Sequence, residues 1–174
     1  MVEIVKKLAK LVKIKDLFFE SVDAQRLLFG APPKEVEIDL SYSAEGALRG
    51  QGMIDAVMSF FVKINGLEKA TVAKIACKVR VVYQYDTAGA RDLKIDNDAV
   101  TAFASTNGIY NAYPYFREFL QASCARLGLP PVIVPVVMAN SLFEQLEAKQ
   151  PKQAEQQSRP TLTIVKSEQR AAGA

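Results

Sequence analysis

Few side chains in this sequence have the types and spacing that catalysis or metal binding requires. The 174 residues include no histidine and two cysteines, Cys77 and Cys124. A chain without histidine can form neither a Ser-His nor a Cys-His nucleophile pair, and two isolated cysteines are too few for a zinc site or a disulfide framework. We expect both cysteines to be small buried side chains. Catalysis by carboxylates or by lysine is still compatible with this composition.

Two short motifs invite a chemical interpretation. The glycines of 46–52 are spaced like those of a phosphate-binding loop, but no Lys-Ser/Thr follows them and no helical pattern begins there. Asp96 and Asp98 could form a carboxylate pair, although two acidic residues at a helix start also cap it and interact favourably with its dipole. We predict a strand connection and a helix start at these places. The sequence indicates no catalytic residue, metal or cofactor, and we expect the protein not to be an enzyme.

The composition is that of a globular domain. Hydrophobic residues make up 49% of the chain and the formal net charge is +3. No apolar run approaches the ~20 residues that span a bilayer, and the N-terminus lacks the layout of a signal peptide. No basic run with interleaved aromatic residues resembles a nucleic-acid footprint. We therefore expect a cytoplasmic protein without stable membrane insertion and without a nucleic-acid partner.

Four segments alternate apolar and polar residues with the period of two that is typical of strands covered on one face. They are residues 13–25, 35–43, 53–64 and 71–85. The Asn65-Gly66 step predicts a hairpin between the third and the fourth, and hence an antiparallel sheet. Helices of the same chain can cover one face. The other carries apolar residues that favour a partner, among them Phe18, Val57, Phe61 and Val82.

Helical spacing appears at both ends of this strand region. Residues 2–12 form a basic amphipathic pattern, which predicts a helix that docks on its own fold or, alternatively, lies on a membrane surface. From Asp96 a helical pattern begins that Gly108 and Pro114 should interrupt, and helices over 115–127 and about 137–149 follow. Residues 1–150 should form one α+β domain. Residues 151–174 should be a mobile tail, in which 161–165 is a β-prone island able to add to a sheet edge.

The segment 107–118, NGIYNAYPYFRE, followed by Leu129-Pro130-Pro131-Val132, resembles the SecB family of export chaperones. That family shares the aromatic-Pro-Tyr, the near-adjacent Arg-Glu and the later Pro-Val, and the resemblance extends over roughly residues 12–150. It implies a four-stranded antiparallel sheet followed by two C-terminal helices. It also implies that two chains pair into an eight-stranded layer and that two layers enclose the long helices in a homotetramer, a dimer of dimers.

The resemblance further implies a holding chaperone that binds unfolded or export-destined polypeptides in a hydrophobic groove without ATP. In the export branch, the family docks on the SecA motor through acidic residues of the sheet. Asp16 and Glu20 match two of these positions, whereas Lys78 stands where a third acid aligns, which disfavours that docking. A second branch protects the antitoxins of toxin–antitoxin systems. That role remains an alternative, as do a non-chaperone adaptor for one partner and, more distantly, an enzyme of uncommon type.

Two sets of residues carry these expectations. We predict that the client-binding groove is formed by apolar residues of the last helix with two contributors from the sheet, unless these residues only cover their own sheet: Val137, Met138, Leu142 and Phe143, with Phe18 and Phe61. We predict that the long helix contributes the contact between subunits: Tyr113, Pro114, Tyr115, Phe116 and Phe119.

Overall fold

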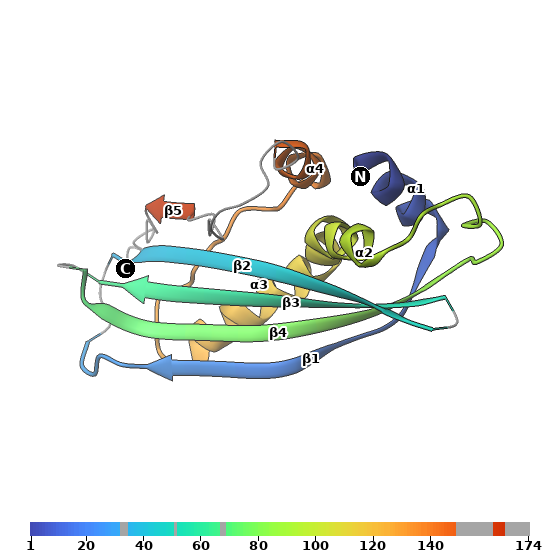
Figure 1. Ribbon diagram of the computed structural model, residues 1–174. Helices are drawn as coiled ribbons and strands as arrows, with labels where there is room; N and C mark the ends of the chain where they lie inside the picture. Colours follow the sequence, from blue (N-terminus) through green and yellow to red (C-terminus); the bar gives the residue numbers. More distant parts are fainter. Residues whose placement is uncertain (32–34, 51, 67–68, 149–161, 166–174) are drawn as a thin grey trace, which may run out of the picture.

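The computed structural model describes residues 1–31, 35–50, 52–66, 69–148 and 162–165. The chain forms two layers, a twisted antiparallel sheet and a group of helices that lie on one of its faces (Figure 1). We call the face toward the helices the inner face and the opposite one the outer face. The predicted α+β class, with strands first and helices after them, is confirmed.

The sheet has the strand order β1-β4-β3-β2-β5, and all neighbouring strands run antiparallel. Its strands are β1 (Val12–Arg26), β2 (Glu37–Arg49), β3 (Met53–Asn65), β4 (Thr71–Tyr85) and β5 (Leu162–Val165). The four predicted strands and the hairpin between β3 and β4 are confirmed. Because β4 and β3 lie between β1 and β2, the chain crosses from one side of the sheet to the other after β1.

The β-prone island of the C-terminal segment pairs with the edge of β2. Leu162 stands opposite Leu40, and Val165 stands opposite Glu37. This strand, β5, adds a fifth member to the four that were predicted. The rest of the expected tail, 149–161 and 166–174, lies outside the described residues.

The alternation of the strands divides the two faces as predicted. In β3, Ile54, Met58 and Phe60 are buried on the inner face, whereas Phe61 on the outer face is exposed. Irregularities in β1 fall between Ile14 and Asp16 and between Phe19 and Ser21. Each irregularity places one extra residue in β1, so the inward-facing positions change from even-numbered to odd-numbered after Ile14. Leu17 and Phe19 therefore pair with inner-face Val81 and Val79, and Phe18 lies opposite Arg80 on the outer face.

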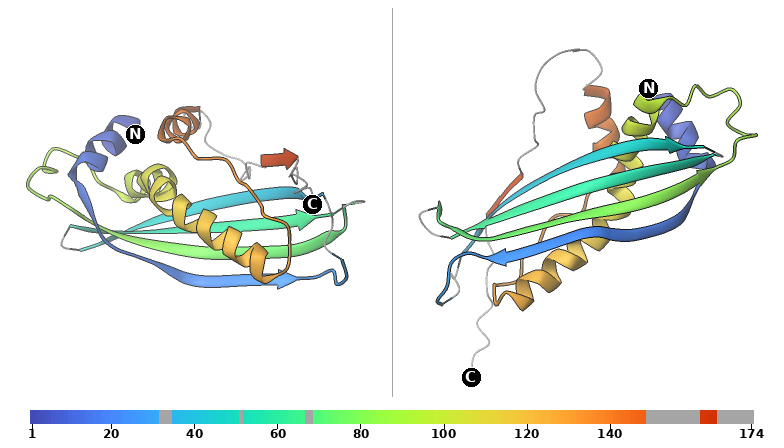
Figure 2. Two further views of the ribbon diagram at one scale, coloured as in Figure 1. Left: turned by 180° about the vertical axis from the view of Figure 1, so that it is seen from behind. Right: turned by 60° about the horizontal axis from the view of Figure 1, so that its bottom comes forward.

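The N-terminal helix α1 (Val2–Leu11) docks on the chain itself. Val5 and Leu8 are fully buried, and the helix contacts α2 (Asn97–Phe103) and α4 (Ala139–Ala148) (Figure 2). The lysines lie on the exposed side of the helix, where their charge stays in water. Of the two alternatives for this segment, the structure shows docking. No helix among the described residues is long and apolar enough to span a membrane.

The helical run from Asn97 to Arg126 is continuous, so the predicted interruption at Gly108 and Pro114 is wrong. A π-helical turn, η2 (Ala104–Gly108), joins α2 to α3 (Ile109–Arg126). Gly108 has helical dihedral angles and lies against the sheet, where an added Cβ would be 2.8 Å from Sδ of Met58. Proline removes one helix hydrogen bond, but buried side chains on both sides of exposed Pro114 pack on the sheet and hold the helix together.

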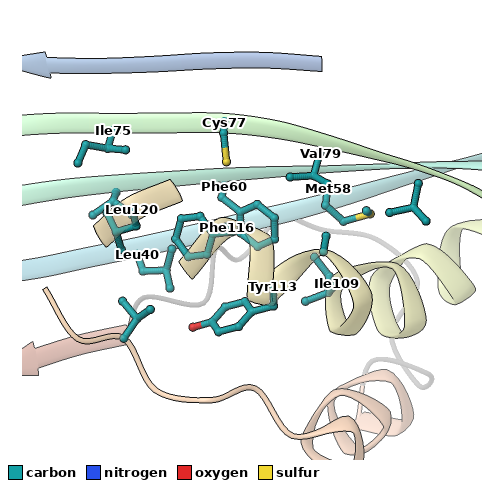
Figure 3. Packing of buried hydrophobic residues seen from close by; sticks show 14 of the residues in the cluster. Leu40, Met58, Phe60, Ile75, Cys77, Val79, Ile109, Tyr113, Phe116 and Leu120 are labelled. Carbon is teal, nitrogen blue, oxygen red and sulfur yellow. The ribbon is translucent and has the colours of Figure 1, made fainter. Parts of the chain in front are cut away.

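The core between the layers is built on aromatic rings. Phe60 of β3 stacks on Phe116 of α3, with ring centroids 4.4 Å apart and planes at 7°. Tyr113 meets the same Phe60 ring edge-on at 6.1 Å (Figure 3). Such pairs add about 0.5–1.5 kcal/mol each beyond the area they bury. The aromatic residues of 107–118 therefore attach the long helix to the centre of the sheet.

Candidate functional site

The residues with potential for chemistry have structural roles. Burial raises the pKa of the Cys77 thiol to about 12 and that of Cys124 to about 11, so both stay protonated and unreactive at neutral pH. Asp96 caps α2 by accepting a hydrogen bond from the Ala99 amide at 3.0 Å, which lowers the pKa of its carboxyl. Gly46 lies inside β2 and faces α2, so the strand connection predicted over 46–52 is wrong at this residue and begins only after Arg49. Among the described residues, no group of three or more His, Cys, Asp and Glu could hold a metal ion.

The connector from Leu127 to Met138 joins α3 to α4 and exposes a row of apolar side chains. Its inward residues Val132 and Val134 are buried in the core. Its outward residues Ile133, Val136 and Met138 are 70%, 63% and 63% exposed. Prolines at 130, 131 and 135 favour an extended backbone over a helix in this connector. We call Ile133, Val136 and Met138 the apolar ridge.

A cavity of about 190 Å³ begins where the ridge ends. It lies between the π turn and α4 and is lined by Thr106, Asn107, Tyr110, Ala139 and Phe143. The Thr106 hydroxyl donates to the backbone carbonyl of Ala102 at 3.1 Å, so this polar group is already satisfied. Sites for small molecules usually measure about 300–1,000 Å³. This cavity suits a single large apolar side chain.

The predicted groove residues separate into three groups. Met138 belongs to the ridge, Phe143 lines the cavity, and Val137 between the ridge residues is partly buried. Leu142 is buried in the core and is available to a ligand only if α4 moves. Phe18 and Phe61 are exposed on the outer face, so the structure does not bring them to α4.

Three members of this surface were not predicted: Ile133, Val136 and Tyr110. The signal for the first two is the apolar run 132–138, in which Val132 and Val134 are buried and Ile133 and Val136 are exposed. A helix was expected to begin at 137, and α4 begins at Ala139. Tyr110 lies on the exposed side of α3 at its first turn, where helical spacing alone does not distinguish it from the core residues beside it.

The residues predicted to form the subunit contact also divide. Tyr113 and Phe116 are buried in this chain's own core, and Phe119 packs on Phe19 with ring centroids 5.3 Å apart. Pro114 and Tyr115 are exposed. The surface of α3 that remains open to another subunit is therefore the side that carries Pro114 and Tyr115.

The three residues aligned with the SecA-docking surface are all in β1 and β4, but no ion pair of the described residues joins Lys78 to Asp16 or Glu20. Glu20 is paired with Arg80, with Oε2 2.9 Å from Nη2, and Arg80 also contacts buried Asp55 at 2.7 Å. Lys78 lies opposite Ser21 and Ser59, and Asp16 lies opposite Val82. The cation that neutralises Glu20 is thus Arg80, a residue that the sequence did not predict for this surface.

A crossover sheet covered by one long helix, with a connector and a short last helix, is the SecB-like fold. The chain is similar to the solved structure of a SecB-like chaperone of Mycobacterium tuberculosis, Rv1957, in complex with a ChAD peptide from the HigA1 antitoxin Rv1956. The TM-score is 0.66 at 22% sequence identity, and the alignment covers 78% of this chain and 97% of that chain. No protein-family model and no curated protein sequence matches the chain. At the level of the fold, the predicted SecB-like resemblance is confirmed.

Proposed function

We propose that this protein is a holding chaperone that binds unfolded polypeptides without ATP, along the apolar ridge and into the cavity beside it. The observation that carries the proposal is the exposure of the ridge. Three large apolar side chains in a row, Ile133, Val136 and Met138, are each more than half exposed on a connector whose other side is well packed. Apolar surface gathered in one place usually marks a binding site.

The energetics of burial favour weak and unselective binding of client segments. Burial of apolar surface contributes about 25 cal/mol per Å², so a client segment that covers ~300 Å² gains several kcal/mol before the costs of association. Methionine and aromatic side chains adapt to different partners because they are flexible or present a broad flat surface. One segment bound by one chain is therefore held weakly, and tight binding requires several sites.

A homotetramer, arranged as a dimer of dimers, supplies these sites. Strand β1 is 15 residues long and lies at the edge of the sheet, and no strand within the described ranges pairs with its free side. An open edge is a template for pairing with a second copy. Four ridges acting on one unfolded chain can gain about 10²–10⁴ in avidity. Light scattering at micromolar concentration tests this, and a stable mass near the 19.1 kDa of one chain would contradict it.

A dedicated role in a toxin–antitoxin system is the second candidate. It is favoured by the similar structure from Mycobacterium tuberculosis, which is a complex with an antitoxin peptide. The two candidates differ in the breadth of clients. A general chaperone binds several unrelated unfolded proteins with comparable affinity, whereas a dedicated one binds its antitoxin much more tightly than the others.

Docking on a SecA motor is expected to be weak in either case. Glu20 is held by Arg80, and Lys78 adds a positive charge to the same face. Charge on such a surface affects affinity and association rate. Lys78→Glu should therefore strengthen binding to SecA, with an effect that shrinks in high salt. Tight binding of the unmodified protein that is insensitive to salt would contradict this expectation.

The ridge is tested by binding a reduced and carboxymethylated protein, which stays unfolded, to the parent chain and to two variants in a fluorescence anisotropy titration. The triple variant Ile133→Ser, Val136→Ser and Met138→Ser should lose at least about tenfold in affinity. The control variant Phe18→Ser and Phe61→Ser removes exposed apolar surface from the outer face and should bind like the parent. Equal binding by the triple variant would refute the ridge as the client site.

A further inference from the structure

The loop after β1 presents the most exposed large apolar side chain of the described residues. Phe29 is 86% exposed, and its neighbours Leu27 and Leu28 are 42% and 50% exposed. An apolar tripeptide at a loop tip would ordinarily fold back onto the protein, because burial of such side chains is favourable. In this loop, hydrogen bonds to the backbone keep the three side chains from folding back onto the protein.

One arginine side chain binds three backbone carbonyls, two in this loop and one at the end of α3. Arg26 donates from Nε to Leu28 O at 3.0 Å, from Nη2 to Gly30 O at 2.7 Å and from Nη1 to Leu127 O at 2.9 Å. The amides of Leu27 and Leu28 both donate to Val72 O of β4. A planar guanidinium spreads its donors over three nitrogens in a fixed fork and so reaches three separate carbonyls, whereas the donors of a lysine all lie on one nitrogen at the end of a flexible chain. These contacts fix the backbone of Leu27, Leu28 and Gly30 in the described part of the loop.

The same arginine joins the loop to the connector. Leu127 is the C-terminal cap of α3 and the first residue of the connector, so the Arg26 contact places the loop beside the start of the segment that carries the ridge. Both views in Figure 2 show the end of β1 next to the end of α3, with the connector running from there to α4. The cavity lined by Ala139 and Phe143 lies at the other end of the connector.

We propose that Arg26 is a positioning residue that holds Leu28 and Phe29 as an apolar finger at one end of the client surface. This inference rests on the proposed function and specifies its ligand. A client segment in extended conformation is held by the finger at one end and by the Tyr110–Phe143 cavity at the other. An extended backbone advances about 3.3 Å per residue, and the twelve-residue connector spans at most ~40 Å. The ligand class is thus an unfolded apolar segment of about ten residues.

A double-mutant cycle on binding of the carboxymethylated protein tests the role of Arg26. Phe29→Ser should lower the affinity about tenfold, since it removes one large apolar anchor from an exposed position. Arg26→Gln should lower it by a similar factor, and Arg26→Lys should not restore it. Because Arg26 acts through the finger, Arg26→Gln should cause a much smaller loss when Phe29 is already serine than it causes alone. By contrast, Arg26→Gln and Met138→Ser should be additive.

Two results would overturn the inference. The first is a double variant of Arg26 and Phe29 that loses the full product of the two single effects, which would show that Arg26 acts on overall stability. The second is unchanged binding by Phe29→Ser in a protein whose ridge variant does lose affinity, which would leave the proposed function standing without the finger. Failure of the parent chain to bind unfolded protein at all would instead refute the proposed function. Phe18→Ser serves as the control for loss of an exposed phenylalanine.

Discussion

Replacement of Gly46 by alanine tests the contact that positions the helical layer on the sheet. A Cβ at this position would lie 2.5 Å from the carbonyl oxygen of Val100 and 2.8 Å from its Cγ1. The clash is with the backbone of α2, so a side-chain rotation cannot relieve it and either α2 or β2 must shift. Overpacking of this kind costs about 1–3 kcal/mol. For a chain of this size each kcal/mol lowers Tm by roughly 2–4 °C, so Gly46→Ala should melt about 2–12 °C below the parent.

Gly50→Ala is the matched control, since no atom lies within 4 Å of an added Cβ there. Its stability should stay within about 0.5 kcal/mol of the parent. Thermal unfolding followed by circular dichroism at one fixed protein concentration is the assay, because association of subunits makes Tm depend on concentration. Equal Tm values for Gly46→Ala and Gly50→Ala would refute the assignment of Gly46 to a close contact between helix and strand.

Two more predictions concern buried groups. Cys77 and Cys124, whose thiol pKa values are raised by burial to about 12 and 11, should not react with a thiol reagent at pH 8 until the protein is denatured; fast reaction in the native state would contradict the packing. Asp55→Asn should destabilise the fold by about 1–3 kcal/mol in a denaturant titration, because the buried carboxylate accepts from Arg80 and Arg49 at 2.7 and 2.6 Å. Glu20→Gln, at the more exposed end of the same network, should cost less, and the reverse order would contradict this account.

The fold was largely predictable because alternation in the sequence reports burial directly. In β3 and β4 every second residue is apolar and buried against the helices. Asp96 and Gly128 delimit the helical run as predicted, Asp96 by its cap and Gly128 by its positive φ of 64°. The predicted interruption at Pro114 failed for a reason that local sequence does not contain. Packing of the aromatic residues on Phe60, which is distant in sequence, outweighs the loss of one helix hydrogen bond.

The candidate site was predictable only in part, because apolar residue types do not distinguish core from binding surface. Met138 and Leu142 are four residues apart in a stretch that was expected to be a single helix, yet one is exposed and the other buried. The difference arises because α4 begins only at Ala139, so Met138 belongs to the extended connector. The finger at Phe29 depends on hydrogen bonds from Arg26 to carbonyls as distant as Leu127, and carbonyl positions cannot be read from residue types.

Suppression of aggregation in the absence of nucleotide tests the central claim most directly. A chemically denatured protein is diluted into buffer that contains the parent chain or the triple ridge variant of Ile133, Val136 and Met138, and turbidity is followed. The parent should slow aggregation at near-stoichiometric amounts without ATP, and the ridge variant should protect much less at the same concentration. Aggregation at the rate of the buffer control with the parent present, or equal protection by the ridge variant, would contradict the proposal that this fold holds unfolded chains on its apolar ridge.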